Sequence, residues 1–111
     1  MSFEVRYTSV FRKALKRLGK KYPSMRNDFG AIIDDLMHDP LIGTPIGKGC
    51  YKVRMAIGSK GKGKSGGARV ITYVRVVHKV VVLLTMFDKS EKESLTDAER
   101  DELIAMADEL L

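Results

Sequence analysis

Two apolar, β-branched segments with a two-residue break between them constrain the fold of this chain most strongly. Residues 68–77 read ARVITYVRVV and residues 80–87 read VVVLLTMF, with His78 and Lys79 in between. Segments of this composition and length, joined by so short a polar break, are typical of two buried strands in a hairpin. The chain is therefore predicted to be built around a sheet whose central strands are neighbours in sequence.

The flanking segments show the periods of further strands and helices. Alternation of apolar and polar residues predicts strands over 3–7 and 51–57. Helical spacing of apolar residues predicts three helices, over 9–19, 24–39 and 97–111. Thr8 or Ser9 is suited to cap the first helix, and Thr96 with Glu99 forms a capping-box pattern before the last one. Residues 41–49 and 58–67 are predicted to be loops.

The predicted order of elements is strand, helix, helix, three strands, helix. This order favours a compact α+β fold with a mostly antiparallel sheet. A chain of 111 residues is close to the common length of one domain and can bury its own core. We therefore expect a single domain over residues 1–111.

Charge is distributed unevenly along the sequence. The net charge of +6 combines a stretch over 51–79, with eight basic and no acidic residues, and a stretch over 80–111, with three basic and nine acidic residues. A basic surface of this kind suggests a polyanionic partner, for which a nucleic-acid backbone is the natural candidate.

Residues 58–65, GSKGKGKS, match the pattern of a phosphate-binding loop. That mechanism requires a helix to begin at the Lys-Ser pair, so that its amino terminus faces the phosphates. Here a turn and a strand are predicted to follow instead. Gly61, Gly63 and Gly66 match a dinucleotide-binding pattern and fail for the same reason. The segment is therefore interpreted as a cationic loop.

Other features of the sequence limit the location and the chemistry. The longest apolar run, near residues 80–86, is far shorter than the ~20 residues that span a bilayer, and the first residues show no signal-peptide pattern. A single cysteine, Cys50, fits the reducing cytoplasm. His38 and His78 are the only histidines, and no ligand spacing predicts a metal or another cofactor.

Four cations form the constellation that could support chemistry: Lys52, Arg54, Arg69 and Lys89. The first two project from one face of a strand, and the others lie near the ends of neighbouring strands. RNA contains its own nucleophile, the 2′-hydroxyl, so cleavage needs alignment and fixed donors for the developing negative charge. Arginine suits this role, and a lysine among other cations can move a proton.

At these same residues the sequence resembles the RelE/HigB superfamily of bacterial toxin–antitoxin systems. The resemblance rests on CYKVR at 50–54, ARVITY at 68–73, VVVLLTM at 80–86 and DKSE at 88–91, in that order. The HigB-type branch is the most similar, through the loop SKGKGKSGGAR and the tail FDKSEKESLTDAE. The upstream strand, two helices and HDPL also fit, so the resemblance covers nearly the whole chain.

This resemblance implies a fold of the microbial-ribonuclease kind and a toxin that cuts messenger RNA on the ribosome. Cleavage would proceed without a metal and leave 2′,3′-cyclic phosphate ends. By position, Lys52 would be a base or charge stabiliser, Arg54 would hold the phosphate, Arg69 would stabilise the transition state, and Lys89 would supply a cation after the last strand.

RNA contacts are expected from a second group of residues, namely Lys60, Lys62, Lys64, Tyr73 and Arg75. Some relatives stack a tyrosine near the carboxyl terminus on a base, but Leu95 stands at that position here. Tyr73 or Phe87 is a candidate replacement.

Partners follow from the same resemblance. They are a cognate antitoxin, the ribosome and messenger RNA. Helix 97–111 would either dock on its own sheet or leave a groove for an antitoxin helix. The alternatives to a nuclease are a non-catalytic RNA- or ribosome-binding module and a gyrase-inhibiting relative of the same fold.

Overall fold

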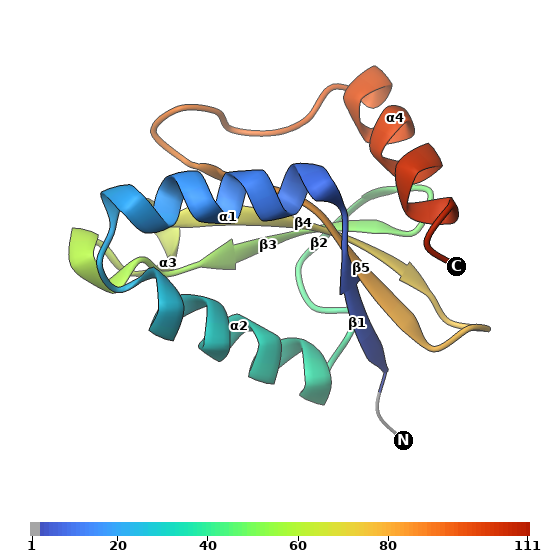
Figure 1. Cartoon of the computed structure of the whole chain (residues 1–111), viewed down its shortest axis with the longest axis horizontal. Coiled ribbons are helices and arrows are strands. Elements are labelled where there is room, and N and C mark those ends of the chain that lie inside the picture. The colour runs from blue at the N-terminus through green and yellow to red at the C-terminus, as the bar shows by residue number, and fades with distance from the viewer. Residues whose placement is uncertain (1–2) are drawn as a thin grey trace.

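The computed structural model describes residues 3–111 and contains one five-stranded sheet in the order β1-β5-β4-β3-β2 (Figure 1). The strands are β1 (Glu4–Tyr7), β2 (Thr44–Gly47), β3 (Cys50–Met55), β4 (Ala68–Arg75) and β5 (Val80–Asp88). β1 runs parallel to β5, and the other three pairings are antiparallel. The predicted α+β class with a mostly antiparallel sheet is confirmed.

The predicted hairpin forms the centre of this sheet. Every residue of β5 is buried, and β4 is buried along all but its last residue. A strand that is covered on both faces has a continuous apolar sequence, which explains the apolar composition of segments 68–77 and 80–87. β4 ends two residues earlier than predicted, and Val76 and Val77 lie in the exposed turn.

Helices cover both faces of the sheet. On one face, α1 (Ser9–Lys21) and α2 (Met25–His38) bury an apolar core that includes Phe11, Leu18 and Leu36. In Figure 1, α1 crosses in front of the strands and α2 is drawn below them. Thr8 caps α1 by accepting a hydrogen bond from the Phe11 amide at 3.0 Å. α1 continues two residues beyond the predicted end at Gly19.

The opposite face is covered by α4 (Asp97–Asp108), whose predicted capping box between Thr96 and Glu99 is present. Leu103 and Ala107 pack into a second apolar core on the sheet. The helix therefore docks on its own sheet, the first of the two predicted alternatives. Over residues 3–111, no helix combines the length and apolar character needed to cross a membrane.

The structure corrects both predicted loops. Residues 41–49 contain the edge strand β2. Its short sequence contains Pro and Gly and shows no strand pattern, because the strand is ordered by its pairing with β3. Residues 58–67 contain η1 (Gly58–Lys60) and the single helical turn α3 (Gly63–Gly66). A four-residue turn followed directly by a strand does not supply the extended helix of a phosphate-binding loop.

An irregularity in β5 changes which face its last residues occupy. Ile71 pairs with Thr85 while Thr72 pairs with Leu83, so Leu84 is an additional residue in β5. Such a bulge reverses the alternation of side chains beyond it. As a result, Phe87 joins the core beneath α4 and the Asp88 carboxylate lies on the side of α1.

Candidate functional site

The four predicted catalytic residues meet in one open hollow of about 280 Å³, hereafter the cationic hollow. It is lined by Thr44, Lys52, Arg54, Arg69, Lys89 and Glu93. β3 presents Lys52 and Arg54 on one face, and Arg69 stands directly opposite Arg54 in the register between β3 and β4. The predicted convergence of the four cations on one concave surface is therefore found, whereas their chemical roles remain predictions.

The cations of this hollow share it with the Glu93 carboxylate, whose charge acts on Arg69. None of the four forms an ion pair over residues 3–111. The Lys52 ammonium donates instead to the main-chain carbonyl of Glu93 at 3.4 Å. Like charges opposed across two strands destabilise a sheet. The facing pair of Arg54 and Arg69 therefore concentrates positive charge at this hollow.

Arg69 is held more firmly than a surface arginine. It is 5% exposed, and its guanidinium donates to the carbonyls of Lys64, Ser65 and Ala68 at 3.1–3.2 Å. Burial, and then the neighbouring Arg54, lower the pKa of this guanidinium. Arg69 therefore fastens α3 to the rim of the hollow while it contributes a fixed charge to the wall.

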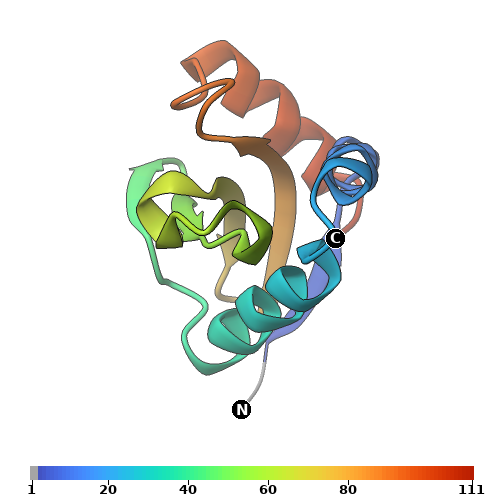
Figure 2. The same cartoon turned by 90° about the vertical axis from the view of Figure 1, so that its left-hand side faces the viewer.

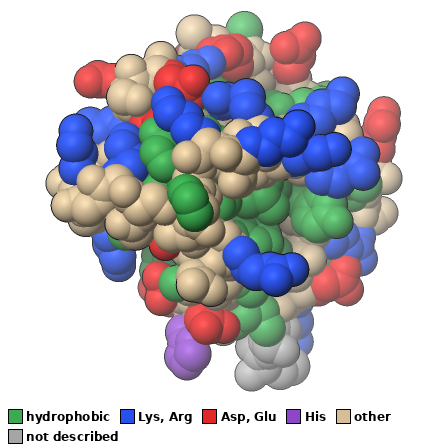
Figure 3. Space-filling view, turned by 60° about the vertical axis from the view of Figure 1, so that its left-hand side comes forward, with side chains coloured by type: hydrophobic (Ala, Val, Ile, Leu, Met, Phe, Trp, Pro, Cys, Tyr) green, Lys and Arg blue, Asp and Glu red, His purple; other side chains and the backbone are tan. Residues whose placement is uncertain are grey.

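The turn α3 carries further cations toward this region. Lys62 and Lys64 are both exposed, and Lys64 lines an adjoining hollow of about 390 Å³ together with Lys52 and Arg54. Figure 2 looks at the end of the molecule that carries α3. In Figure 3, Lys and Arg side chains are numerous across the upper half of the visible face.

Lys60 was predicted to contact RNA, but its ammonium is already engaged within the folded chain. Its ammonium pairs with the fully buried Asp88 at 2.8 Å, and its side chain is 12% exposed. Asp88 also accepts hydrogen bonds from the Tyr22 hydroxyl and from Ser90. Burial acts to raise the pKa of Asp88, but the bonds from Lys60, Tyr22 and Ser90 outweigh it and hold that pKa well below its usual range. Lys60 is a structural residue that anchors the loop.

The aromatic residues and Arg75 are also placed elsewhere than predicted. Tyr73 and Phe87 are each 6% exposed and belong to the core beneath α4, so neither presents a ring to a base. The Tyr73 hydroxyl donates to Asp108 at 2.9 Å, and Arg75 donates to that hydroxyl at 3.0 Å. Both polar groups are thus occupied in holding α4 to the sheet.

Three residues near the site were not found from the sequence as functional candidates. Glu93 and Thr44 line the cationic hollow, and His38 lines the adjoining one. Thr44 and Glu93 belong to segments without strong periodicity, so their positions depend on β2 pairing and on the path of the chain after β5. His38 was interpreted as a polar surface residue; its Nδ1 atom lies 2.8 Å from the Asp34 carbonyl.

The remaining reactive groups do not form a second centre. Burial raises the pKa of the Cys50 thiol to about 11, so this side chain is a packed thiol rather than a nucleophile. Over residues 3–111, no three His, Cys, Asp or Glu side chains are grouped closely enough to hold a metal ion.

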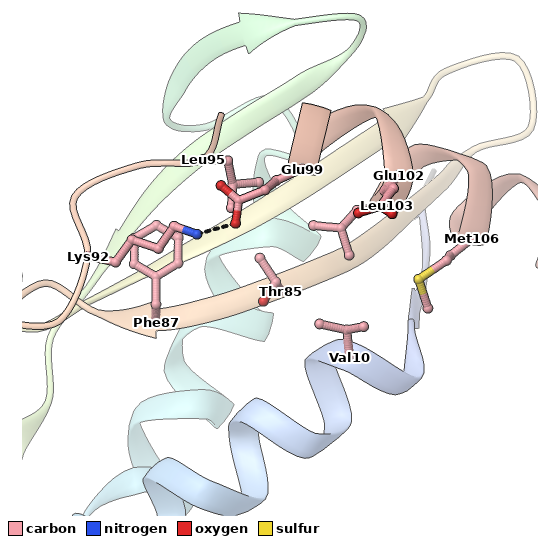
Figure 4. Close-up of a pocket in the computed structure, with 9 residues that line it drawn as sticks. All are labelled: Val10, Thr85, Phe87, Lys92, Leu95, Glu99, Glu102, Leu103 and Met106. Carbon is pink, nitrogen blue, oxygen red and sulfur yellow. Dashed lines mark hydrogen bonds and ion pairs between the residues drawn. The ribbon is translucent and has the colours of Figure 1, made fainter. Parts of the chain in front are cut away.

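A separate apolar groove of about 430 Å³ lies between α1, β5 and α4. Figure 4 shows Val10, Leu103 and Met106 facing it, with the ion pair of Lys92 and Glu99 at one end. Leu95 lines this groove rather than the cationic hollow.

Comparisons with known proteins agree with this architecture. Three solved structures have the same fold, at TM-scores of 0.60, 0.61 and 0.60. The toxin–antitoxin complex RelBE2 from Mycobacterium tuberculosis is 22% identical over 79% of this chain and 99% of its own. A doubly substituted E. coli RelE toxin in the free state is 18% identical over 95% of this chain and 97% of its own.

The isolated E. coli RelE toxin is 14% identical over 94% of this chain and 98% of its own. The family model described as the RelE toxin of the RelE/RelB toxin–antitoxin system matches residues 9–111. The chain therefore belongs to the RelE toxin family of toxin–antitoxin systems.

Proposed function

We propose that this chain, acting as a single domain, is a toxin that cleaves messenger RNA on the ribosome. The observation that carries the proposal is the convergence of four cations on one hollow, where none of them forms an ion pair over residues 3–111. Within the family we assign the chain to the HigB-type branch. That assignment is supported by the lysine- and glycine-rich segment 59–69 and by the tail that follows β5.

The chemistry of the hollow suits attack by the RNA's own 2′-hydroxyl. Arg54 is exposed and forms no ion pair over residues 3–111, so it can form a two-pronged contact with a phosphate that enters the hollow. Lys52 and Lys89 place two further charges around the same phosphate, and Arg69 supplies one that cannot move away. Together they would stabilise the charge that develops on phosphorus without a metal ion.

The partners that we propose follow from this activity. The substrate is messenger RNA in the ribosome, which aligns the reacting groups and places the toxin in the cytoplasm. A cognate antitoxin would hold the toxin inactive, a proposal supported by the similarity to a protein whose structure was solved as a toxin–antitoxin complex.

The test is to induce the chain in bacteria and to map the 5′ ends of transcripts. The parent should arrest growth and produce new ends within translated messages, and Arg54→Ala should abolish both effects. Arg12→Ala is the matched control, because Arg12 is an exposed arginine of α1 away from the hollow and should leave cleavage unchanged.

Other results would select an alternative. Growth arrest with intact messages and equal toxicity of Arg54→Ala would contradict the nuclease and favour a non-catalytic binding module. A DNA-damage response instead of message cleavage would favour action on gyrase.

A further inference from the structure

We propose that Glu93 is the general base that removes the proton from the attacking 2′-hydroxyl. This assignment rests on the proposed ribonuclease function and adds to it the group that the four cations do not provide. Glu93 lies in the segment between β5 and α4, and it is the acidic residue among those that line the cationic hollow.

The pairing of nearby carboxylates sets Glu93 apart. Asp88 pairs with Lys60, Glu91 pairs with Arg17, and Glu99 pairs with Lys92. Glu93 forms no ion pair over residues 3–111, although it shares its hollow with four cations.

The main chain keeps Glu93 at the hollow. Its carbonyl accepts from the Lys52 ammonium at 3.4 Å, so the residue is tied to β3 through its backbone. The charge of its carboxylate acts on Arg69, which places that carboxylate beside the cations of the hollow. The charged groups that face it are Lys52 and Arg54 from β3, Arg69 from β4 and Lys89 after β5. Lys64 of α3 lies in the adjoining hollow.

The hollow needs a proton acceptor, and its cations are poor ones. Lysine and arginine are protonated at neutral pH and act as donors, whereas an ionised carboxylate only accepts. In the proposed step, the 2′-hydroxyl proton passes to the Glu93 carboxylate as the bond from the 2′-oxygen to phosphorus forms. The bond from phosphorus to the 5′-oxygen breaks, and that oxygen takes a proton from a lysine ammonium of the hollow. Solvent then restores both groups.

The experiment compares Glu93→Gln with the parent and with Glu109→Gln, a control at the exposed end of α4. Single-turnover cleavage of ribosome-bound messenger is measured across pH. Binding is measured with the same messenger carrying a 2′-deoxy nucleotide at the cleavage site. We expect Glu93→Gln to cleave roughly 100-fold more slowly and to show a pH profile that differs from the parent's. It should bind the 2′-deoxy messenger at least as tightly, because a negative charge leaves a cationic hollow.

Two results would overturn the assignment while the proposed function stands. One is a Glu93→Gln variant with the parent's rate and pH profile, and the other is a loss of rate matched by an equal loss of affinity. If the parent leaves messages uncut, the proposed function fails and the base assignment fails with it. The assignment would be established if Glu109→Gln cleaves at the parent's rate while Glu93→Gln cleaves more slowly and binds the 2′-deoxy messenger at least as tightly.

Discussion

The opposed arginines in the cationic hollow lower the stability of the folded chain. Arg54 and Arg69 face each other across β3 and β4 on the same side of the sheet. No ion pair within residues 3–111 relieves their repulsion, and the charge of Glu93 opposes it only in part at Arg69. Groups arranged in this way are common where a protein must bind a charged ligand, since the ligand removes the repulsion when it binds.

Asp88 is the residue whose charge is expected to matter most for stability. It is fully buried against Lys60, so removing its charge leaves a nearly buried ammonium unpaired. Asp88→Asn should lower the free energy of unfolding by about 3 kcal/mol at neutral pH. Urea denaturation measures this loss, and Asp101→Asn is the control because the Asp101 carboxylate is exposed, so losing its ion pairs with Lys48 and Arg100 should change stability far less.

The pH dependence of this loss has a definite sign. The pKa of Asp88 is lowered in the folded state, so its contribution is present above the unfolded value of about 4 and disappears as the pH falls below it. The difference between the parent and Asp88→Asn should therefore shrink steadily below about pH 4. A difference that is the same at pH 3 and at pH 7 would contradict this account of the pair.

At the residue scale, the sequence was most informative where the position in a strand determines the direction of a side chain. Lys52 and Arg54 were predicted on one face because they are two residues apart in a strand, and both line the cationic hollow. Lys60, Tyr73 and Arg75 were assigned to RNA from residue type alone. Their partners, Asp88 and Asp108, are distant in sequence, so only the folded chain reveals that these groups are already engaged.

At the element scale, a glycine sets the geometry where the cationic loop enters β4. A Cβ atom on Gly67 would lie 2.1 Å from the Met55 carbonyl oxygen and 2.9 Å from the Ile57 amide nitrogen. Gly67→Ala should therefore force β3 and β4 apart beside Arg69, lowering stability by about 2 kcal/mol and reducing message cleavage.

Gly30→Ala provides the contrast for this prediction. Gly30 lies within α2, and nothing lies within 4 Å of a Cβ atom built there. Alanine should stabilise that helix by roughly 0.5–1 kcal/mol and leave cleavage unchanged. Thermal unfolding and the transcript assay measure both variants. Equal stability of the two variants would show that the close approach at Gly67 is relieved without strain.

The elements that the sequence predicted are those with their own periodicity or composition. The central hairpin, the two helices on one face and the capped α4 all carry local signals, and all are present. β2 and the bulge in β5 carry none, because each is defined by pairing with another strand. The bulge matters for the site, since it directs Asp88 toward the side of α1 while Lys89, the next residue, lines the cationic hollow.

Across the whole molecule, the acid-free stretch over 51–79 does not form one uniform surface. Lys52, Arg54 and Arg69 lie in the cationic hollow, and Lys64 lies in the adjoining one. Lys60 is instead paired with the buried Asp88, and Arg75 is paired with Asp108 of α4. The net charge in the sequence indicated a polyanionic partner, but the fold determines which of these charges a partner can reach.

The salt dependence of RNA binding tests which cations of residues 51–79 contact RNA and which are paired within the fold. The ligand is a single-stranded messenger fragment with a 2′-deoxy nucleotide at the cleavage site, and its affinity is measured from 50 to 200 mM salt. Each cation that contacts a phosphate contributes about 0.7 to the slope of log affinity against log salt. Lys62→Ala and Lys64→Ala should each flatten the slope by about that amount, because both side chains are exposed on the loop.

Lys60→Ala is the matched comparison within the same loop. Its charge is neutralised by Asp88 in the folded chain, so this substitution should leave the slope unchanged and instead lower the free energy of unfolding. Equal flattening by all three substitutions would mean that the Lys60 pair opens when RNA binds. An unchanged slope in all three would move the RNA path away from α3 and confine phosphate contact to the cationic hollow itself.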